Sequence, residues 1–437
     1  MKNLRISHWG TLSVALWAML VTTCFADSSA AYLDASLPVE KRVEDLLGRM
    51  TLEEKVAQMR IFHANKGIGV SEDGRMLLSG DVENRLKFGI AGIKNPGEMN
   101  SPTEAAELNN QLQQYIIDKS RLGIPAMCVC EAYNGVDAHG STRFMRPINM
   151  AATWTVDLVH RIWQVTGRDA RVRGMHMCPA PGSDIVRDPR FGRMSEAFGE
   201  DTWLTTEMVV AAVTGVQGGY DGAGLNRMHI GAVAKHFAGY GQVQGGRNFS
   251  SIQISPRTLV DEIFPPFKAA VQRGNALGIM AAHGDINGIA SHADSWLLTD
   301  VLRNDWGFKG YVVSDSNDIA RLHDFMKVAQ SHESAAEMAL KAGVDIDLYS
   351  DLAYTYLPAM AKKDPSLMEY IDRSVGHVLR TKFVLGLFEN PFVSVEDTQK
   401  EVRSIASQEL ALEADLESAI LLKNENNALP LNPDRVT

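Results

Sequence analysis

Charged and polar side chains follow several apolar segments of this chain, at the points where those segments should end. Two carboxylates, an arginine, a lysine and two histidines hold such positions: Glu131, Asp315, Arg187, Lys235, His236 and His283. Carboxylates accept hydrogen bonds from hydroxyl groups, whereas Arg and Lys donate to the same oxygens and keep nearby acids ionised. Gathered in one pocket, the set predicts binding of a polyhydroxylated ligand such as a small sugar.

Asp315 is the member of this set best suited to covalent chemistry. Sugar hydrolysis with retention of configuration needs one ionised carboxylate as nucleophile and one proton donor roughly 5–5.5 Å away. Asp315 directly follows the apolar run that ends at Ser314 and fits the first role, while no second acid is an obvious donor. A second interpretation stays open, because Asp also caps helices and residues 319–325 read as a helix.

Apolar and β-branched segments that read as buried strands recur along the chain and alternate with helical segments. They are residues 89–93, 124–131, 175–178, 230–234, 277–282, 311–313 and 344–348. Short loops between such units indicate a parallel sheet, and this many units in one chain predict an α/β fold, a closed (β/α)8 TIM-like barrel. The C-terminal ends of barrel strands form one face of the molecule. The polar residues named above should therefore meet on that face.

Composition excludes several classes of protein. The 437 residues include 43 basic and 53 acidic side chains and no Lys/Arg cluster, which argues against a nucleic-acid partner. After residue 26 the cysteines are Cys128, Cys130 and Cys178, all in apolar, strand-like runs, so we expect buried free thiols. Cys-x-Cys is poor zinc spacing and no second Cys or His pair lies nearby in the sequence. We therefore predict no metal site and no cofactor.

The first 26 residues predict a destination outside the cytoplasm. Lys2 and Arg5 precede a largely apolar run that ends in small and polar residues, which is typical of a signal peptide cleaved after Ala26. A membrane anchor is the alternative, but the apolar run is short and no further stretch of about 18 apolar residues follows. We expect a secreted or periplasmic protein that is not attached to a membrane after cleavage.

Three motifs together resemble glycoside hydrolase family 3. They are Arg-Asp-Pro-Arg-Phe-Gly-Arg at residues 187–193, Lys-His-Phe-Ala-Gly-Tyr-Gly at 235–241 and Val-Val-Ser-Asp at 312–315. The runs at 131–136 and 421–425 strengthen the resemblance, because all five motifs stand in the order and spacing of that family.

The resemblance implies a domain organisation and an activity. It extends from about residue 38 to 431 and implies a catalytic barrel at residues 38–390. A C-terminal helical linker and the start of a truncated second domain follow at residues 391–437. The linker leads towards an α/β sandwich domain that the chain lacks. The implied activity is that of an O-glycosyl hydrolase similar to β-glucosidases, which retains configuration and acts on a small oligosaccharide or β-glycoside.

The resemblance also assigns roles to single residues. Asp315 matches the catalytic nucleophile. The positions that hold the hydroxyls of the first sugar are matched by Glu131, Arg187, Lys235 and His236. His283 falls near a pocket position often filled by an aromatic side chain, and we include it among the substrate-binding residues. Asp188 should brace Arg187.

Three departures from the family pattern affect function. Ser316 stands where many relatives have a Trp that stacks on the next sugar, and Asn248 stands where many have Asp. The usual acid/base Glu comes from the second domain, so a second domain or chain would have to supply it. Some single-domain relatives use a His–Asp pair on a loop instead, but the corresponding loop here, residues 242–254, has no His. The alternative function is therefore a catalytically impaired fragment or a sugar-binding protein.

Overall fold

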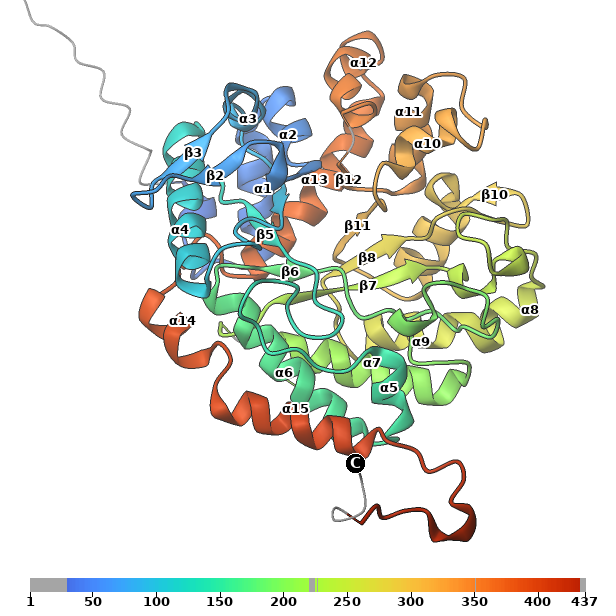
Figure 1. Cartoon of the computed structure of the whole chain (residues 1–437). Coiled ribbons are helices and arrows are strands. Elements are labelled where there is room, and N and C mark those ends of the chain that lie inside the picture. Colours follow the sequence, from blue (N-terminus) through green and yellow to red (C-terminus); the bar gives the residue numbers. More distant parts are fainter. Residues whose placement is uncertain (1–29, 220–224, 226, 350, 433–437) are drawn as a thin grey trace, which may run out of the picture.

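Eight parallel strands form the centre of the computed structural model, which describes residues 30–219, 225, 227–349 and 351–432 (Figure 1). Around the sheet the order is β11-β8-β7-β6-β5-β4-β1-β12. A bridge between Val313 and Ile346 joins β11 to the chain just before β12, and the Ser314 N–H donates to the Ile346 carbonyl at 2.9 Å. The predicted (β/α)8 TIM-like barrel is confirmed.

The barrel strands are short and lie in the order that the sequence predicted. Their bounds are β1 Arg60–His63, β4 Gly92–Lys94, β5 Met127–Val129, β6 Met177–Cys178, β7 Gly231–Phe237, β8 Gly278–Ala281, β11 Tyr311–Val313 and β12 Asp347–Leu348. Seven of the eight were expected. The missing one, β1, has only two fully buried apolar residues, Ile61 and Phe62, between Arg60 and His63, so its sequence carries no strand pattern.

Alternation along the strands determines which side chains reach the barrel mouth. Tyr311 and Val313 point into the cluster inside the barrel, whereas Val312 packs in the larger cluster between strands and helices. Because side chains two residues apart lie on the same face of a strand, Asp315 continues the inward-facing series. Met127 and Val129 likewise place Glu131 on the inner side. The apolar layer thus forms the floor below the polar residues.

Capping boxes begin several of the helices. Thr51 and Glu54 cap α2 (Leu52–Ala57), and Ser101 and Glu104 cap α4 (Pro102–Lys119). The other helices around the barrel are α1 Val39–Arg49, α3 Gly80–Leu86, α5 Pro147–Ala152, α6 Val156–Val172, α7 Thr202–Gln217, α8 Pro256–Thr258, α9 Phe264–Gln272, α10 Asp318–Asp324, α11 His332–Ala342, α12 Leu357–Lys363 and α13 Leu367–Val384. Two stretches, Leu259–Ile263 and Trp296–Asp305, are π-helical. Hairpins pair β2 (Ile68–Val70) with β3 (Met76–Leu78) and β9 (Asp285–Ile286) with β10 (Ile289–Ala290).

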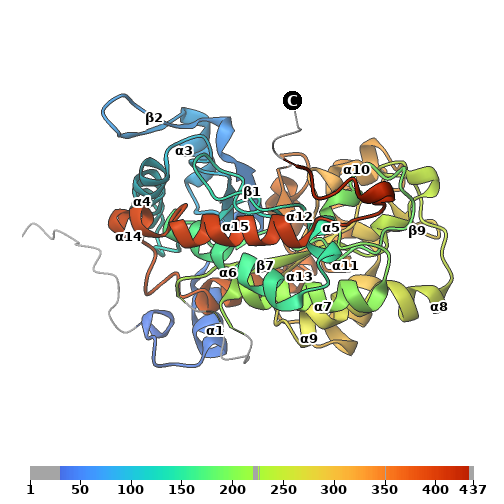
Figure 2. The same cartoon turned by 60° about the horizontal axis from the view of Figure 1, so that its bottom comes forward.

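Beyond the barrel, α14 (Val395–Glu401) and α15 (Ile405–Glu417) run across its outer surface (Figures 1 and 2). Arg161 of α6 donates to both carboxylate oxygens of Glu413 at 2.6 and 3.0 Å, which fixes α15 beside α6. Within the region expected to hold a helical linker, α15 ends at Glu417. The boundary of the barrel domain at residue 390 stays a prediction, because α14 and α15 pack on the barrel itself.

Two further expectations concern cysteines and membranes. Cys128, Cys130 and Cys178 are buried free thiols, and burial raises the pKa of Cys128 and Cys130 to about 12. None of the helices that the structure describes is both long and apolar enough to cross a membrane. The predicted signal peptide, residues 1–26, lies outside the described residues.

Candidate active site

Asp315 lies at the mouth of the barrel and bonds to other site residues. Its Oδ2 is 2.8 Å from His283 Nε2 and 3.7 Å from His236 Nε2, and the Ser316 N–H donates to Oδ1 at 2.6 Å. The interpretation of Asp315 as a helix cap is wrong, because α10 is preceded by Asn317 and has no side-chain cap. Burial alone would raise the pKa of Asp315, but the hydrogen bond and charge of His283 hold it well below its usual value. The carboxylate is therefore ionised, as a nucleophile requires.

His283 links two carboxylates. Its Nε2 bonds Asp315 and its Nδ1 lies 2.5 Å from Oδ2 of Asp318, the first residue of α10. Burial would lower the pKa of His283, yet the two carboxylates outweigh it and raise that pKa to about 9. At neutral pH both ring nitrogens therefore carry protons and donate. The ring also packs against Phe249, with centroids 4.3 Å apart.

His236 also lies near Asp315 but is neutral, whereas His283 is positively charged. The Arg193 guanidinium lies 3.0 Å from His236 Nε2 and can only donate, so Nε2 accepts and Nδ1 donates to Asp184 at 2.8 Å. Burial outweighs the Asp184 carboxylate and lowers the pKa of His236 below its ordinary value. The Asp315 carboxylate thus lies near a charged and a neutral imidazole.

Glu131 forms a second carboxylate centre together with two lysines. Lys94 Nζ, at the end of β4, contacts Glu131 Oε1, and Lys235 Nζ lies 3.6 Å from Oε2. Burial would raise the pKa of Glu131, but these ammonium groups lower it to about 2. Glu131 Oε2 is buried and accepts no hydrogen bond in the described part of the chain, and the same is true of Asp184 Oδ1. A buried oxygen that accepts no hydrogen bond is costly, and a ligand hydroxyl that donates to it would remove that cost.

Arg187 does not join this cluster. Its side chain is 40% exposed and pairs with Glu262 at 2.5 Å, and Asp188 pairs with Arg190 rather than bracing Arg187. The cause is the turn that follows: Phe191 is buried and packs edge-on to Tyr240, so the chain re-enters the site two residues later.

Arg193 occupies the place expected for Arg187. It donates to His236, to the Tyr240 hydroxyl at 3.3 Å and to Glu196 at 2.9 Å. Lys235 Nζ also lies 3.9 Å from Glu196. The structure therefore brings together five of the six predicted site residues. Arg193 lies where the sixth, Arg187, was expected.

Sequence reasoning missed several partners of the predicted residues. They are Lys94, Arg193, Glu196, Tyr240 and Asp318, together with the pairing of Asp184 to His236. Two signals were present: Lys94 directly follows an apolar strand, and Arg193 closes the Arg-Asp-Pro-Arg-Phe-Gly-Arg motif.

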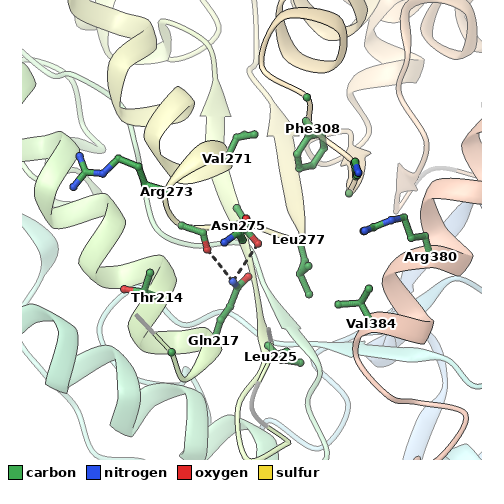
Figure 3. Close-up of a pocket in the computed structure, with 16 residues that line it drawn as sticks. Thr214, Gln217, Leu225, Val271, Arg273, Asn275, Leu277, Phe308, Arg380 and Val384 are labelled. Atoms are coloured by element: carbon green, nitrogen blue, oxygen red, sulfur yellow. Dashed lines mark hydrogen bonds between the residues drawn. The ribbon is translucent and has the colours of Figure 1, made fainter. Parts of the chain in front are cut away.

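A separate hollow of about 370 Å³ opens at the opposite end of the barrel (Figure 3). Ala276 and Leu277, just before β8, and Gly310, just before β11, line it. Gln217 reaches across it to the carbonyls of Gly274 and Asn275 at 3.1 and 3.2 Å. It lies at the N-terminal ends of the strands and contains none of the residues that surround Asp315.

Comparison with known proteins shows which family this chain belongs to. The family model described as "Glycosyl hydrolase family 3 N terminal domain" matches residues 51–381. This chain belongs to glycosyl hydrolase family 3. It is 64% identical over 409 residues to a putative β-xylosidase of Formosa agariphila, covering 94% of this chain and 54% of that protein. A periplasmic β-glucosidase of Salmonella typhimurium is 35% identical over 89% of this chain and 48% of its own length.

A solved β-glucosidase structure matches the fold closely. A β-glucosidase from Erythrobacter marinus superposes with a TM-score of 0.86 at 38% identity, covering 92% of this chain and 53% of the other. The chain thus spans about half the length of these relatives. Membership of family 3 agrees with the motif resemblance and with the barrel.

Proposed function

We propose that this chain is the catalytic barrel of a retaining β-glycosidase that releases terminal non-reducing β-glucosyl or similar residues, such as β-xylosyl. The observation that carries the proposal is an ionised carboxylate, Asp315, at the mouth of the barrel, together with two buried carboxylate oxygens, on Glu131 and Asp184, that accept no hydrogen bond in the described part of the chain. The names of the family 3 relatives, β-glucosidases and β-xylosidases, support the substrate class.

In the first step, a carboxylate oxygen of Asp315 attacks the anomeric carbon. A bond forms between that oxygen and the carbon, and the bond from the carbon to the leaving oxygen breaks with transfer of a proton to that oxygen. Water then attacks the same carbon, loses a proton, and restores the Asp315 carboxylate. Two displacements retain the β configuration.

Charged side chains of both signs hold the sugar hydroxyls. Glu131 and Asp184 accept from hydroxyls through their unpaired oxygens, and Lys235 and Arg193 donate to hydroxyl oxygens. Lys235 retains its proton because Glu131 and Glu196 outweigh its burial and raise its pKa. The pocket therefore offers both hydrogen-bond donors and acceptors to the sugar hydroxyls.

Neither Glu131 nor Glu196 is suited to donate the proton of the first step. Lysines 94 and 235 hold Glu131 ionised, and Arg193 holds the pKa of Glu196 below its ordinary value against the effect of burial. His283 lies on the nucleophile itself, whereas the donor belongs roughly 5–5.5 Å away. We propose that the donor is a Glu from the part of the relatives' length that this chain does not span, in a second domain or chain.

The proposed location is the periplasm or the exterior of the cell. The apolar N-terminal run and the periplasmic β-glucosidase among the relatives support it.

The test is covalent trapping of the intermediate. A 2-fluoro-β-glucoside or 2-fluoro-β-xyloside with an activated leaving group should add one glycosyl unit to the protein, and peptide mass spectrometry should place it on Asp315. Asp315→Asn should abolish both labelling and hydrolysis of aryl glycosides while still binding sugar. Sugar binding by the wild type without labelling or turnover of activated glycosides would instead identify a sugar-binding protein. Labelling of another residue would refute the assignment of Asp315.

A further inference from the structure

Three potential metal ligands converge where α10 ends and α11 begins. His323 and Asp324 are the last two residues of α10, and His332 is the first residue of α11. One ligand atom of each lies within 4.8 Å of the others. His332 Nε2 is 2.9 Å from Asp324 Oδ1, and the two imidazole rings meet edge to face with centroids 5.0 Å apart. We propose that His323, Asp324 and His332 bind a divalent transition metal ion, with Zn²⁺ as the best fit.

The orientation of His323 is already set for this role. Its Nδ1 lies 3.1 Å from the Ala329 carbonyl, which can only accept, so Nδ1 carries the proton and Nε2 keeps its lone pair. Metal-binding histidines are held in this way by a backbone carbonyl or carboxylate on the other ring nitrogen. The carbonyl is fixed as well, because the N–H groups of Val328 and Ala329 both donate to Leu322 at 2.9 and 3.1 Å.

The ligand types decide the class of metal. Two imidazole nitrogens and one carboxylate suit Zn²⁺, Co²⁺, Ni²⁺ or Cu²⁺, whereas Ca²⁺ and Mg²⁺ prefer sites made of oxygen atoms. Three protein ligands leave a fourth position for water. The site is half-open, with side-chain exposures of 23% for His332 and 49% for Asp324, so an ion can enter. The sequence did not indicate it, because a His-Asp pair and a His eight residues further on match no common metal-binding spacing.

Binding would join two helices next to the active site. The ion would replace the proton that His332 shares with Asp324, so affinity should fall at low pH. It would link the C-terminal end of α10 to the start of α11. The N-terminal end of α10 carries Asp318, which holds His283. We infer a structural role, since Asp318 and the three ligands lie at opposite ends of α10.

The test uses wild type, His323→Gln, His332→Gln and, as a matched control, His139→Gln, which changes an exposed histidine on another surface loop. Chelator-treated protein is titrated with Zn²⁺ by calorimetry and with Co²⁺ by visible absorption. Wild type and the control should bind one ion, with ligand-field bands for Co²⁺ and a rise in Tm of about 3 °C at Zn²⁺ one hundred times above Kd. Loss of a partner that merely orients a ligand costs about 10- to 100-fold in affinity, so loss of a ligand should cost at least ~100-fold.

Two results would overturn the proposal. Wild type that binds no Zn²⁺ in a one-to-one ratio would leave only the Asp324–His332 hydrogen bond that the structure shows. Variants that bind as tightly as wild type would place the ion elsewhere. Circular dichroism and Tm of the chelated variants verify that each is folded. Neither readout depends on glycosidase activity.

Discussion

Replacing His283 with Gln or with Phe separates the hydrogen bond that Asp315 receives from the positive charge that accompanies it. Gln can still donate to Asp315 but carries no charge, whereas Phe does neither and suits the neighbouring Phe249. Both substitutions leave Asp315 in a buried place, where loss of His283 allows burial to raise its pKa. Since only the ionised carboxylate attacks, the acid limb of kcat/KM should move to higher pH.

The size of the shift follows from the contact. A hydrogen bond to a charged group contributes about 1.5–3 kcal/mol, which corresponds to about 1–2 pKa units. His283→Phe should therefore move the acid limb up by about 1–2 pH units, and His283→Gln by less. In wild type a second limb is expected near pH 9, where His283 loses its proton, and this limb should disappear in both variants.

The assay is kcat/KM for an activated aryl β-glycoside across the pH range, after pre-incubation at each pH to exclude unfolding. Asp318→Asn is the internal control, because it keeps His283 in place but removes one of the carboxylates that hold its proton. Its alkaline limb should move below pH 9. Variant profiles that superimpose on the wild-type profile would refute the coupling of His283 to Asp315. Absence of any wild-type turnover would instead count against the proposed function.

Three further predictions follow from the site. Glu131→Gln should lower kcat/KM by about 10- to 100-fold, mainly through KM, because it removes a charged acceptor from the sugar pocket; steady-state kinetics checks this. Arg193→Lys should reduce kcat/KM at least ~10-fold, since Lys cannot contact Glu196, Tyr240 and His236 together. Arg187→Lys should leave kcat/KM nearly unchanged. Equal losses in the two variants would show that Arg187 also belongs to the site. The pKa of His283 is higher in the folded chain than the ordinary 6.5, so its contribution to stability is present below about pH 6.5 and is lost as pH rises through about 9. Urea unfolding at both ends of this window should show a loss of up to ~3 kcal/mol that His283→Phe lacks.

The sequence predicted those parts of the molecule that depend on local pattern. Buried parallel strands read as continuous apolar runs, so seven of the eight were visible, and β1 was missed because the polar residues Arg60 and His63 stand at its two ends. Strand-end residues such as Asp315 and Glu131 were predicted because they stand where apolar runs end. The interpretation of Asp315 as a helix cap could be rejected only from the structure, in which Asn317 precedes α10.

Contacts between residues on different loops could not be predicted from sequence patterns. Arg187 and Arg193 belong to one motif and are the same residue type, and the structure places Arg193, beyond the buried Phe191, in the site and Arg187 outside it. Asp318 acts on His283 from a different barrel unit, 35 residues away in the chain. Such contacts arise because β8 and β11 pair side by side in the sheet.

The charge balance around Asp315 suggests why His283 is a histidine rather than the aromatic residue expected at that position. Five carboxylates lie in or next to the site, on Glu131, Asp184, Glu196, Asp315 and Asp318, and five cations face them, on Lys94, Arg193, Lys235, His283 and Arg321. Paired charges of this kind can be buried, whereas an unpaired one is strongly unfavourable. In the proposed mechanism Asp315 loses its charge when it forms the glycosyl ester, and the protonated His283 is left with one carboxylate in place of two. Return of Asp315 to the carboxylate restores the balance, so the arrangement should favour hydrolysis of the intermediate. In His283→Phe that advantage is absent, and the labelled 2-fluoroglycosyl enzyme should lose its sugar more slowly than the labelled wild type.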